Sequence, residues 1–399
     1  MAAVLKHWRE AATLILVTST KLSRAVSLQL TSSVSKASDP HSDNLDVLLL
    51  KRSSKSTFMP NMYVFPGGAA VNSDFSAKWL SVFQKLGDDI QQTLFMQLSE
   101  GSGSAAPMFS RERDPAFSTI PSEVAFRICA IRETFEESGV LLALPVDQSR
   151  RQLNSFLVQN TSASPSSLYT NASVIKAWRQ RVNNDPDEFL NMCLELDLVP
   201  EIWSLYEWAN WLTPARSDPN SPKWKRFDTA FFICCVDHKP EAVEDAAETV
   251  KTVWASPSSL LSAYYEQEGG LAVPQVYELS KLVSFRSAND LLRLAAQPNR
   301  SRVVQYLTYP LMTTDYVIEV LPGDDLYTQL TELSSSGTVP QFKESLDELY
   351  KKYHNHNKLI LLKATPFIFT IQCTIPPLKG HVNPDVKFLD NIIRTKAKL

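Results

Sequence analysis

The stretch "RETFEESGV" (residues 132–140) places three glutamates within five residues of a segment that otherwise has the pattern of a buried helix. At about 100° per residue, the apolar side chains of this segment form one narrow stripe, which comprises Val124, Ile128, Ile131 and Phe135. Glu133, Glu136 and Glu137 fall on the opposite side, where their spacing brings the carboxylates together. Arg132, four residues before Glu136, is placed to orient that carboxylate.

Two interpretations of these three glutamates, here called the carboxylate patch, remain open on the pattern alone. Most charged clusters form the solvated face of an amphipathic helix. Carboxylates that converge around a single arginine also repel one another unless a cation lies among them, and Mg²⁺ or Mn²⁺ takes oxygen ligands of this kind.

The helix is expected to begin at Pro121-Ser122, with Ser122 as its N-cap, and to end at Gly139.

Composition restricts the class of protein. The chain has 399 residues, a net charge of −3 and no concentrated run of basic residues, which argues against a general nucleic-acid binder. Its longest apolar runs, near residues 12 and 359, are far shorter than the ~20 residues of a membrane span. The five cysteines contain no CxxC pair, so we expect reduced, mostly buried thiols, as in an intracellular protein, and no zinc site.

Strands and helices are expected in mixed order along the chain. Apolar runs predict strands at "AATLILV" (11–17), "LDVLLLKR" (45–52) and "RFDTAFFICCVD" (226–237). The stretch "VKTVWASPSSLLSAYYEQ" (250–267) predicts a strand, a turn and a short helix, and residues 150–200 predict polar helices.

Several other residues have both a functional and a structural interpretation. Trp203, Trp208 and Trp211 could stack on adenine, but large aromatic side chains chiefly supply buried area, so a place in the core is expected. His354 and His356 would share one face of a strand, but no third metal ligand accompanies them, so a loop is expected there.

The carboxylate patch also carries a resemblance to a known family. "RETFEESGV" resembles the core of the Nudix box, of which Arg132 is part, and "FPGG" (residues 65–68) resembles the turn at which that box begins. The resemblance implies a hydrolase that requires Mg²⁺ or Mn²⁺. By that resemblance, the metal ligands would be Glu133, Glu136, Glu137 and the carbonyl of Gly67.

The chain departs from the Nudix pattern in two positions and in one spacing. Thr134 stands where the family has an apolar residue, and the family's earlier glutamate falls at Val124, one place after Glu123. In addition, 63 residues separate Gly68 from Arg132, far more than in the compact box. This spacing indicates an insertion between the turn and the helix.

The base that would deprotonate the attacking water remains open between two glutamates. Glu136 belongs to the carboxylate patch, and Glu248 precedes the strand "VKTVW", a region from which Nudix enzymes supply an acidic residue. Glu244 and Asp245 are close rivals of Glu248. A surface carboxylate is the alternative to any catalytic role for these three.

A second pattern lies upstream of the turn. "LLLKRSSKSTFMPNMYVFPGG" (48–68) aligns without gaps to the signature of Nudix enzymes that cleave coenzyme A, although Leu50, Thr57 and Asn61 depart from it. The matching residues are Leu48, Leu49, Arg52, Ser53 and Phe65–Gly68. Arg52, together with Lys51 or Lys55, could contact the phosphates of coenzyme A. The structural alternative is a strand followed by a basic turn, which is common.

The resemblance extends over nearly the whole chain to the peroxisomal subgroup of these enzymes. It implies an α+β Nudix fold, with a mixed sheet sandwiched between helices, over residues 10–265. Insertions are expected at about 18–44, 69–121 and 150–200, and an extension of helices and strands at 266–399. The implied reaction is hydrolysis of the pyrophosphate of coenzyme A and acyl-coenzyme A to 3′,5′-ADP and (acyl-)4′-phosphopantetheine.

Two other functions stay open at this point. One is a Nudix hydrolase for another dinucleotide, of the ADP-ribose or NADH type, which would share the helix. The other is a non-catalytic binding protein with a Nudix fold, although the intact set of three glutamates argues against it.

The two ends of the chain predict different destinations. Residues 1–38 are basic and rich in serine, as in a mitochondrial transit peptide. The last three residues, Ala397-Lys398-Leu399, resemble the peroxisomal address S-K-L. We expect binding to the peroxisomal import receptor and an uncleaved N-terminus, because "AATLILV" has the pattern of a sheet strand. The mitochondrion is the alternative.

Overall fold

The computed structural model describes residues 8–20, 44–56, 59–100, 106–159, 165–214, 226–245, 248–297, 303–333, 339–362 and 368–396. Among the helices of these ranges, none combines the length and the apolar character of a membrane span. Most of the expected insertion at 18–44, position 57 of the upstream signature and the C-terminal tripeptide lie outside the described residues.

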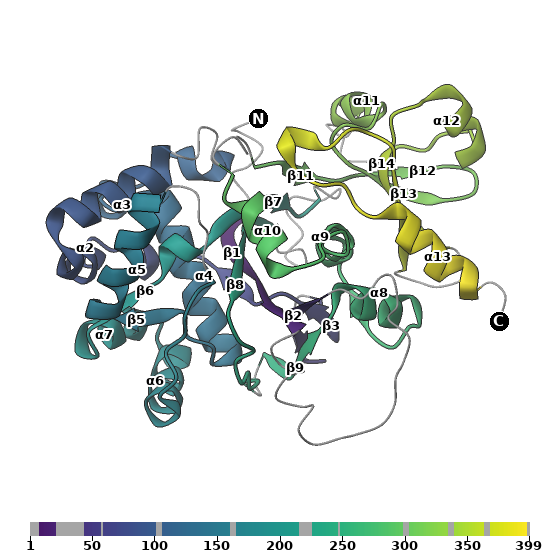
Figure 1. Ribbon diagram of the computed structural model, residues 1–399. Helices are drawn as coiled ribbons and strands as arrows, with labels where there is room; N and C mark the ends of the chain where they lie inside the picture. The colour runs from purple at the N-terminus through teal and green to yellow at the C-terminus, as the bar shows by residue number, and fades with distance from the viewer. Residues whose placement is uncertain are drawn as a thin grey trace, which may run out of the picture.

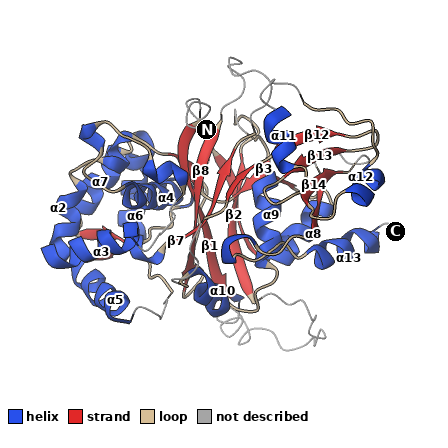
Figure 2. Ribbon diagram, turned by 90° about the horizontal axis from the view of Figure 1, so that it is seen from above, coloured by secondary structure: helices blue, strands red, loops and turns tan. Residues whose placement is uncertain are grey.

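Nine strands of the described ranges form one mixed sheet, in the order β10-β3-β2-β1-β8-β7-β11, with β4 paired to β1 and β9 paired to β2. Strands β1 and β8 run parallel, whereas β1 and β2 run antiparallel. Figure 2 shows this sheet between two groups of helices. The strands are β1 (Arg9–Ser19), β2 (Leu45–Arg52), β3 (Met62–Val64), β4 (Gly67–Ala69), β7 (Tyr206–Leu212), β8 (Phe227–Val236), β9 (Thr249–Ala255), β10 (Gly270–Leu271) and β11 (Gln305–Leu307).

Strand β1 is buried on both faces, which explains its unbroken apolar sequence. Because side chains alternate along a strand, Leu14 and Leu16 enter one hydrophobic core, whereas Ile15 and Val17 enter another on the opposite face. We call these the first core and the second core. The predicted strands at 11–17, 45–52 and 226–237 are confirmed.

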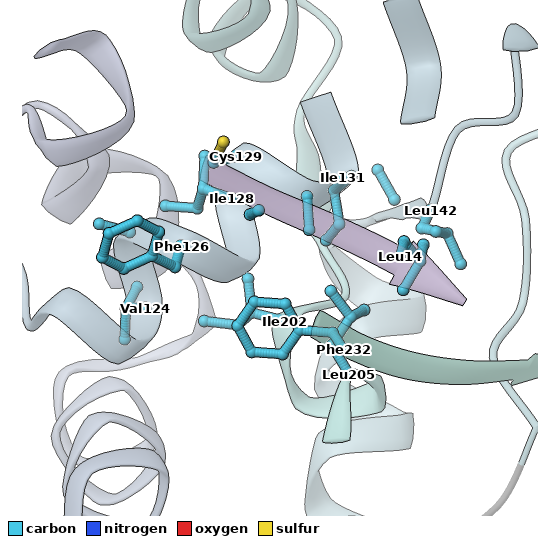
Figure 3. Packing of buried hydrophobic residues seen from close by; sticks show 14 of the residues in the cluster. Leu14, Val124, Phe126, Ile128, Cys129, Ile131, Leu142, Ile202, Leu205 and Phe232 are labelled. Carbon is cyan, nitrogen blue, oxygen red and sulfur yellow. The ribbon is translucent and has the colours of Figure 1, made fainter. Parts of the chain in front are cut away.

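The glutamate-rich helix, α4 (Ser122–Ser138), lies in the first core. Figure 3 shows its apolar side chains packed beside Leu14 of β1 and Phe232 of β8. The helix ends as predicted at Gly139, whose φ of 74° is left-handed. The predicted N-cap is wrong by one residue: Pro121 is the N-cap, and Ser122 is helical, with its hydroxyl accepting a hydrogen bond from Nε of Arg113 at 3.0 Å.

The expected solvent-facing side of α4 is also largely covered, which corrects the picture of a single apolar stripe. Phe126 and Cys129 lie outside the predicted stripe, yet neither is exposed to solvent. The cover comes from the chain between the turn and the helix, because Phe75 and Phe109 pack on Phe126 with ring centroids 5.4 and 5.3 Å apart.

Two of the expected insertions build the helical layer on this side of the sheet, left in Figure 1. The predicted helices in 150–200 are present, but they are less polar than expected, because Trp178, Phe189 and Met192 join the first core. A short pair of strands, β5 (Ala143–Pro145) with β6 (Leu198–Pro200), brings together the two ends of the insertion at 150–200. The helices are α2 (Trp79–Phe83), α3 (Asp88–Glu100), α5 (Val146–Gln159), α6 (Ala172–Asn184) and α7 (Asp187–Glu195).

The C-terminal part covers the other face of the sheet and adds a second, antiparallel sheet of order β12-β13-β14-β15. Its core continues into the second core through Leu359, Ile371 and Leu389. The elements are α8 (Pro257–Tyr265), α9 (Val273–Leu282), α10 (Ala288–Ala295), β12 (Tyr309–Met312), β13 (Val317–Val320), α11 (Tyr327–Leu333), α12 (Leu346–Lys352), β14 (Asn357–Leu361), β15 (Phe369–Cys373) and α13 (Val386–Lys396).

The tryptophans at 203, 208 and 211 lie in the core, as predicted. The indole N–H groups of Trp208 and Trp211 donate to the carboxylate of Glu278 at 2.7 and 2.8 Å. Glu278 also pairs with Lys281, and both side chains are 0 % exposed. Both residues of this buried pair belong to α9, and Glu278 joins the helix to β7 of the large sheet. His354 and His356 lie in a loop, also as predicted.

Candidate active site

The "FPGG" turn reaches the carboxylate patch through two glycines, and a side chain at either position would force a neighbouring group to move. Gly68 pairs with Ala12 of β1, and Gly67 pairs with Thr13. A Cβ atom on Gly67 would lie 2.5 Å from the carbonyl oxygen of Ala12, and one on Gly68 would lie 2.4 Å from Oε2 of Glu133. The turn therefore lies directly against α4, although the insertion separates the two in the sequence.

The three glutamates of the patch are gathered as the sequence predicts, but each carboxylate already has a partner. Nη1 of Arg132 donates to Oε1 of Glu133 at 2.9 Å and to Oε1 of Glu136 at 2.7 Å, which confirms the predicted orientation of Glu136. Oε2 of Glu137 accepts the backbone N–H of Gly67 at 2.9 Å. The three side chains are 14, 17 and 5 % exposed, in sequence order.

Burial and crowding make negative charge unfavourable in this patch. Burial, with repulsion from Glu136 and Asp74, raises the pKa of Glu133 to about 7 against the pull of Arg132. Burial also raises the pKa of Glu136, and it raises that of Glu137 well above its ordinary value, with further repulsion from Glu133. A cation among these oxygens would relieve both effects.

The residues present fit a hard divalent cation by chemistry, because the patch offers only oxygen ligands beside a glycine cradle. In the arrangement seen here, however, no three His, Cys, Asp or Glu side chains of the described residues form a metal-ligand set. Glu133 and Glu136 are directed at Arg132, and Glu137 at Gly67. The backbone N–H of Gly67 is the group seen to contact the patch, and its carbonyl as a ligand stays a prediction.

Arg52 connects the patch to Glu248. Its Nη1 lies 3.9 Å from Oε1 of Glu137, and its Nη2 lies 3.6 Å from Oε2 of Glu248. The strand ends are tied together, because the N–H of Ser53 donates to the carbonyl of Glu248 at 2.8 Å. The Glu248 side chain is 68 % exposed, so its carboxylate is accessible from solvent at the edge of the patch.

Asp245, which the sequence offered as an alternative to Glu248, forms hydrogen bonds with residues of its own loop. Its Oδ1 accepts hydrogen bonds from the N–H of Glu248, the N–H of Thr249 and the hydroxyl of Thr249. That hydroxyl also lies 3.3 Å from the carbonyl of Glu137. Asp245 thus holds the start of β9 against the end of α4, whereas Glu248 is exposed and lies beside Arg52.

The predicted basic group of Arg52, Lys51 and Lys55 is divided by the pleat of β2. Nζ of Lys51 lies 5.6 Å from the ring centroid of Tyr63, and Tyr63 packs on the second core. Arg52 points to the other face, toward the first core and the patch. Lys55 is exposed in the turn that follows β2. Arg52 is therefore the predicted phosphate-binding residue that the structure brings to the patch.

Two residues of the insertions take part in the site and were missed in the sequence. Asp74 forms a two-pronged ion pair with Arg132. Nε of Arg179, on α6, donates to the carbonyl of Glu136 at 2.9 Å, where a positive charge suits the C-terminal end of a helix. Burial lowers the pKa of Arg179. Three nearby carboxylates oppose this effect, because they favour the charged guanidinium: Asp245, Glu244 and Glu137. No local pattern marks Arg179, whose partner lies far along the chain, whereas Asp74 follows Gly68 at the spacing that the Nudix box has between its glycine and its earlier glutamate.

Glu123, the nearest residue to the earlier glutamate of the box, does not reach the patch. It stands in the first turn of α4, ten residues before Glu133, which corresponds to about 15 Å along the helix. Burial raises its pKa, opposed by its own backbone and by Arg127 and Arg113. Its place at the far end of α4 gives it no role in the patch.

A mixed sheet between helices, with a glycine turn held against a glutamate-rich helix, defines the class of protein as a Nudix hydrolase. Residues 8–282 match the family described as "NUDT19 Nudix domain", and residues 310–374 match the one described as "NUDT19 C-terminal domain". The chain belongs to the NUDT19 family. This confirms the predicted family and fold class.

Three relatives carry the name "Acyl-coenzyme A diphosphatase NUDT19". The protein from Xenopus laevis is 37 % identical over 385 residues, which cover 96 % of this chain and 97 % of the relative. The protein from Gallus gallus is 34 % identical and covers 95 % of both chains. The protein from Homo sapiens is 32 % identical, over 86 % of this chain and 88 % of its own.

Proposed function

We propose that this chain hydrolyses the pyrophosphate bond of coenzyme A and acyl-coenzyme A, giving 3′,5′-ADP and (acyl-)4′-phosphopantetheine. The observation that carries the proposal is the convergence of the carboxylate patch, the glycine turn and Arg52 at one place. The names of the relatives support the same substrate class, because their similarity extends over nearly the whole chain.

A divalent cation is part of this proposal, and Mg²⁺ or Mn²⁺ is the expected ion. Glu133, Glu136 and Glu137 would hold it, with the carbonyl of Gly67. The cation would supply positive charge to the pyrophosphate and make water more acidic. Because Arg132 binds Glu133 and Glu136 in this structure, these carboxylates would have to share their oxygens between Arg132 and the cation.

Arg52 and Glu248 have complementary tasks in the proposed reaction. The planar guanidinium of Arg52 suits a phosphate group, and it lies between two carboxylates that a phosphate could replace as its partners. Glu248 is exposed beside it and can accept the proton of the attacking water as a general base. Glu136 is the alternative base, although its contact with Arg132 at 2.7 Å favours a ligand role.

The position of Lys51 keeps a second candidate function open, namely hydrolysis of an ADP-ribose or NADH type of dinucleotide. With Lys51 on the opposite face, Arg52 and the exposed Lys55 are left to recognise a 3′-phosphate. A substrate panel with product identification separates the two functions. We expect coenzyme A and acyl-coenzyme A to be preferred over ADP-ribose and NADH, with 3′,5′-ADP as a product. A preference for ADP-ribose or NADH would overturn the proposed substrate.

We further propose that the tripeptide Ala397-Lys398-Leu399 directs the chain to peroxisomes through their import receptor. The tripeptide follows α13, which ends at Lys396. The alternative, removal of a mitochondrial transit peptide, would damage the sheet if cleavage fell beyond residue 9, since β1 is a central strand. Deletion of the three residues should leave the protein diffuse in the cytosol. Peroxisomal import of the truncated chain would contradict the proposal.

A further inference from the structure

The carboxylate patch lies at the C-terminal end of α4, where a helix has no partners of its own for its backbone. The last four carbonyls of an α-helix find no N–H group within the helix, and such ends fray. In α4 these are the carbonyls of residues 135–138. The placement of the Glu136 and Glu137 carboxylates therefore depends on the groups that bind this end.

Two of these four carbonyls are bound by backbone groups. The N–H of Gly139 donates to the carbonyl of Phe135 at 2.9 Å, and the N–H of Val243 donates to that of Ser138 at 2.9 Å. Val243 lies in the loop that leads into β9. The second bond therefore ties the last residue of α4 to a distant part of the chain.

The other two carbonyls, those of Glu136 and Glu137, are bound by side chains. The hydroxyl of Thr249 lies 3.3 Å from the carbonyl of Glu137, and Nε of Arg179 donates to the carbonyl of Glu136 at 2.9 Å. The bond from Arg179 carries a positive charge, which is favourable at the C-terminal end of a helix. Because Arg179 belongs to α6, the insertion at 150–200 supplies the charged cap of the helix that carries the patch.

The guanidinium of Arg179 is packed into this end of the helix. A Cβ atom on Gly139 would lie 3.3 Å from its Nη1. Asp245 attracts its charge and also accepts the hydroxyl of Thr249 at 3.0 Å. One carboxylate thus supports both of the side chains that cap α4.

The position of Arg179 is unfavourable for the guanidinium itself. Its Nη2 is shielded from solvent and has no hydrogen-bond acceptor among the described residues, and a buried donor without an acceptor costs stability. Burial also lowers the pKa of the side chain. The fold therefore gains little stability from this group, which points to a task at the end of α4.

We propose that Arg179 is a positioning residue of the active site. By binding the carbonyl of Glu136, it holds the last turn of α4 in place, so that the carboxylates of Glu136 and Glu137 stay placed for a divalent cation. The proposal rests on the metal-dependent function proposed above. Arg179 contacts no reacting group, and it gives the insertion at 150–200 a part in catalysis.

The test uses the full chain and Arg179→Met, which keeps an unbranched side chain but removes the charge and the donors. Mn²⁺ binding, measured calorimetrically without substrate, is expected to weaken at least tenfold. Because no substrate is present, a wrong substrate assignment would not affect this result. If the parent itself fails to bind Mn²⁺, the metal-dependent function is overturned and this proposal with it.

Hydrogen exchange of the metal-free protein reports on the helix end directly. In Arg179→Met, the amides of residues 136–139 should exchange at least tenfold faster than in the parent, because the last turn opens more often. The amides near the middle of α4, at residues 127–131, should keep their parental rates. Unchanged exchange at 136–139 would show that Arg179 does not hold this turn, and would overturn the proposal.

Arg181→Met is the matched control on the same helix. Nε of Arg181 donates to Glu188 at 2.6 Å, and its guanidinium lies 3.6 Å from the ring centre of Trp178, so these contacts stay within the insertion. This variant should lower Tm yet bind Mn²⁺ as the parent does. If Arg179→Met behaves in the same way, with a lower Tm and parental Mn²⁺ affinity, Arg179 is merely structural and the proposal is wrong.

A conservative variant tests the role of the charged cap. Lysine can also donate to the last carbonyls of a helix, so Arg179→Lys should retain most of the Mn²⁺ affinity that Arg179→Met loses. Equal losses in the two variants would contradict the role of charge. Should Arg179→Met fail to fold, Arg179→Gln takes its place, since its shorter polar side chain leaves room for water. The same tenfold loss is expected for it, and parental affinity would count against the proposal.

Discussion

Replacing Glu133 by glutamine should stabilise the metal-free protein at alkaline pH while it impairs catalysis. Burial, with repulsion from Glu136 and Asp74, raises the pKa of Glu133 from 4.5 to about 7, despite the attraction of Arg132. The side chain is 14 % exposed, so solvent screens these effects only weakly. The ionised carboxylate is therefore a source of instability in the metal-free protein.

The sign of the pH dependence follows from this shift. Below about pH 4.5, Glu133 is protonated in both the folded and the unfolded chain, and it adds no pH dependence to the free energy of unfolding. Between that pH and about 7, only the unfolded chain ionises, so the folded state loses stability as the pH rises. Above this range the full difference remains, and at 1.36 kcal/mol per pKa unit it amounts to at most about 3 kcal/mol.

Urea unfolding in the presence of EDTA, at pH 5 and at pH 8, measures this contribution. Glu133→Gln should reduce the loss of stability between the two values by up to about 3 kcal/mol, because the neutral amide oxygen can still accept from Arg132. Glu348→Gln is the control. Glu348 is an exposed capping residue of α12 whose pKa is lowered by hydrogen bonds from Ser345. This change should leave the loss of stability between pH 5 and pH 8 as it is in the parent.

A metal-free Glu133→Gln variant that is less stable than the parent at pH 8 would contradict this expectation. That result would mean that the charged carboxylate stabilises the fold through Arg132 by more than its burial destabilises it. In the catalytic assay, the same variant should lose most of its Mg²⁺-dependent turnover, since a neutral amide is a weaker ligand for a hard cation.

Three further outcomes are expected. Glu136→Gln and Glu137→Gln should each lower kcat by orders of magnitude with little change in Tm, and near-normal Mg²⁺-dependent turnover of both would contradict their assignment as ligands. Arg52→Ala should erode a preference for coenzyme A over dephospho-coenzyme A, and equal kcat/KM values for the two substrates in the parent would refute that role. Lys281→Ala should destabilise the fold by about 3–5 kcal/mol in urea unfolding, because it leaves the Glu278 carboxylate buried without its cation. A change below about 1 kcal/mol would show that the hydrogen bonds from Trp208 and Trp211 suffice to stabilise this carboxylate.

Local chemistry in the sequence was enough to predict the main elements of the fold and the carboxylate patch. The stripe Val124, Ile128, Ile131 and Phe135 recurs at the helical period, so it indicated α4 without any knowledge of its neighbours. The glycines of the turn and Gly139 could be recognised because glycine is typical of tight turns and of helix C-termini.

Contacts between residues distant in the chain were decided only by the tertiary structure. Asp74 lies 58 residues before Arg132, so only the fold brings the two side chains together. The burial of Phe126 depends on Phe75 and Phe109 from the insertion, so a stripe computed along one helix could not include it.

The pleat and the packing of β2 corrected the prediction that Lys51 and Arg52 act together. Lys51 and Arg52 are adjacent in the sequence and look equivalent as cations, but neighbouring side chains on a strand point to opposite faces. The apolar run and the two basic residues predicted a strand that leads to the turn. Which face meets α4 was decided by the packing of Tyr63 on the second core and of α4 on the first, and that choice brings Arg52 to the carboxylates while it keeps Lys51 away.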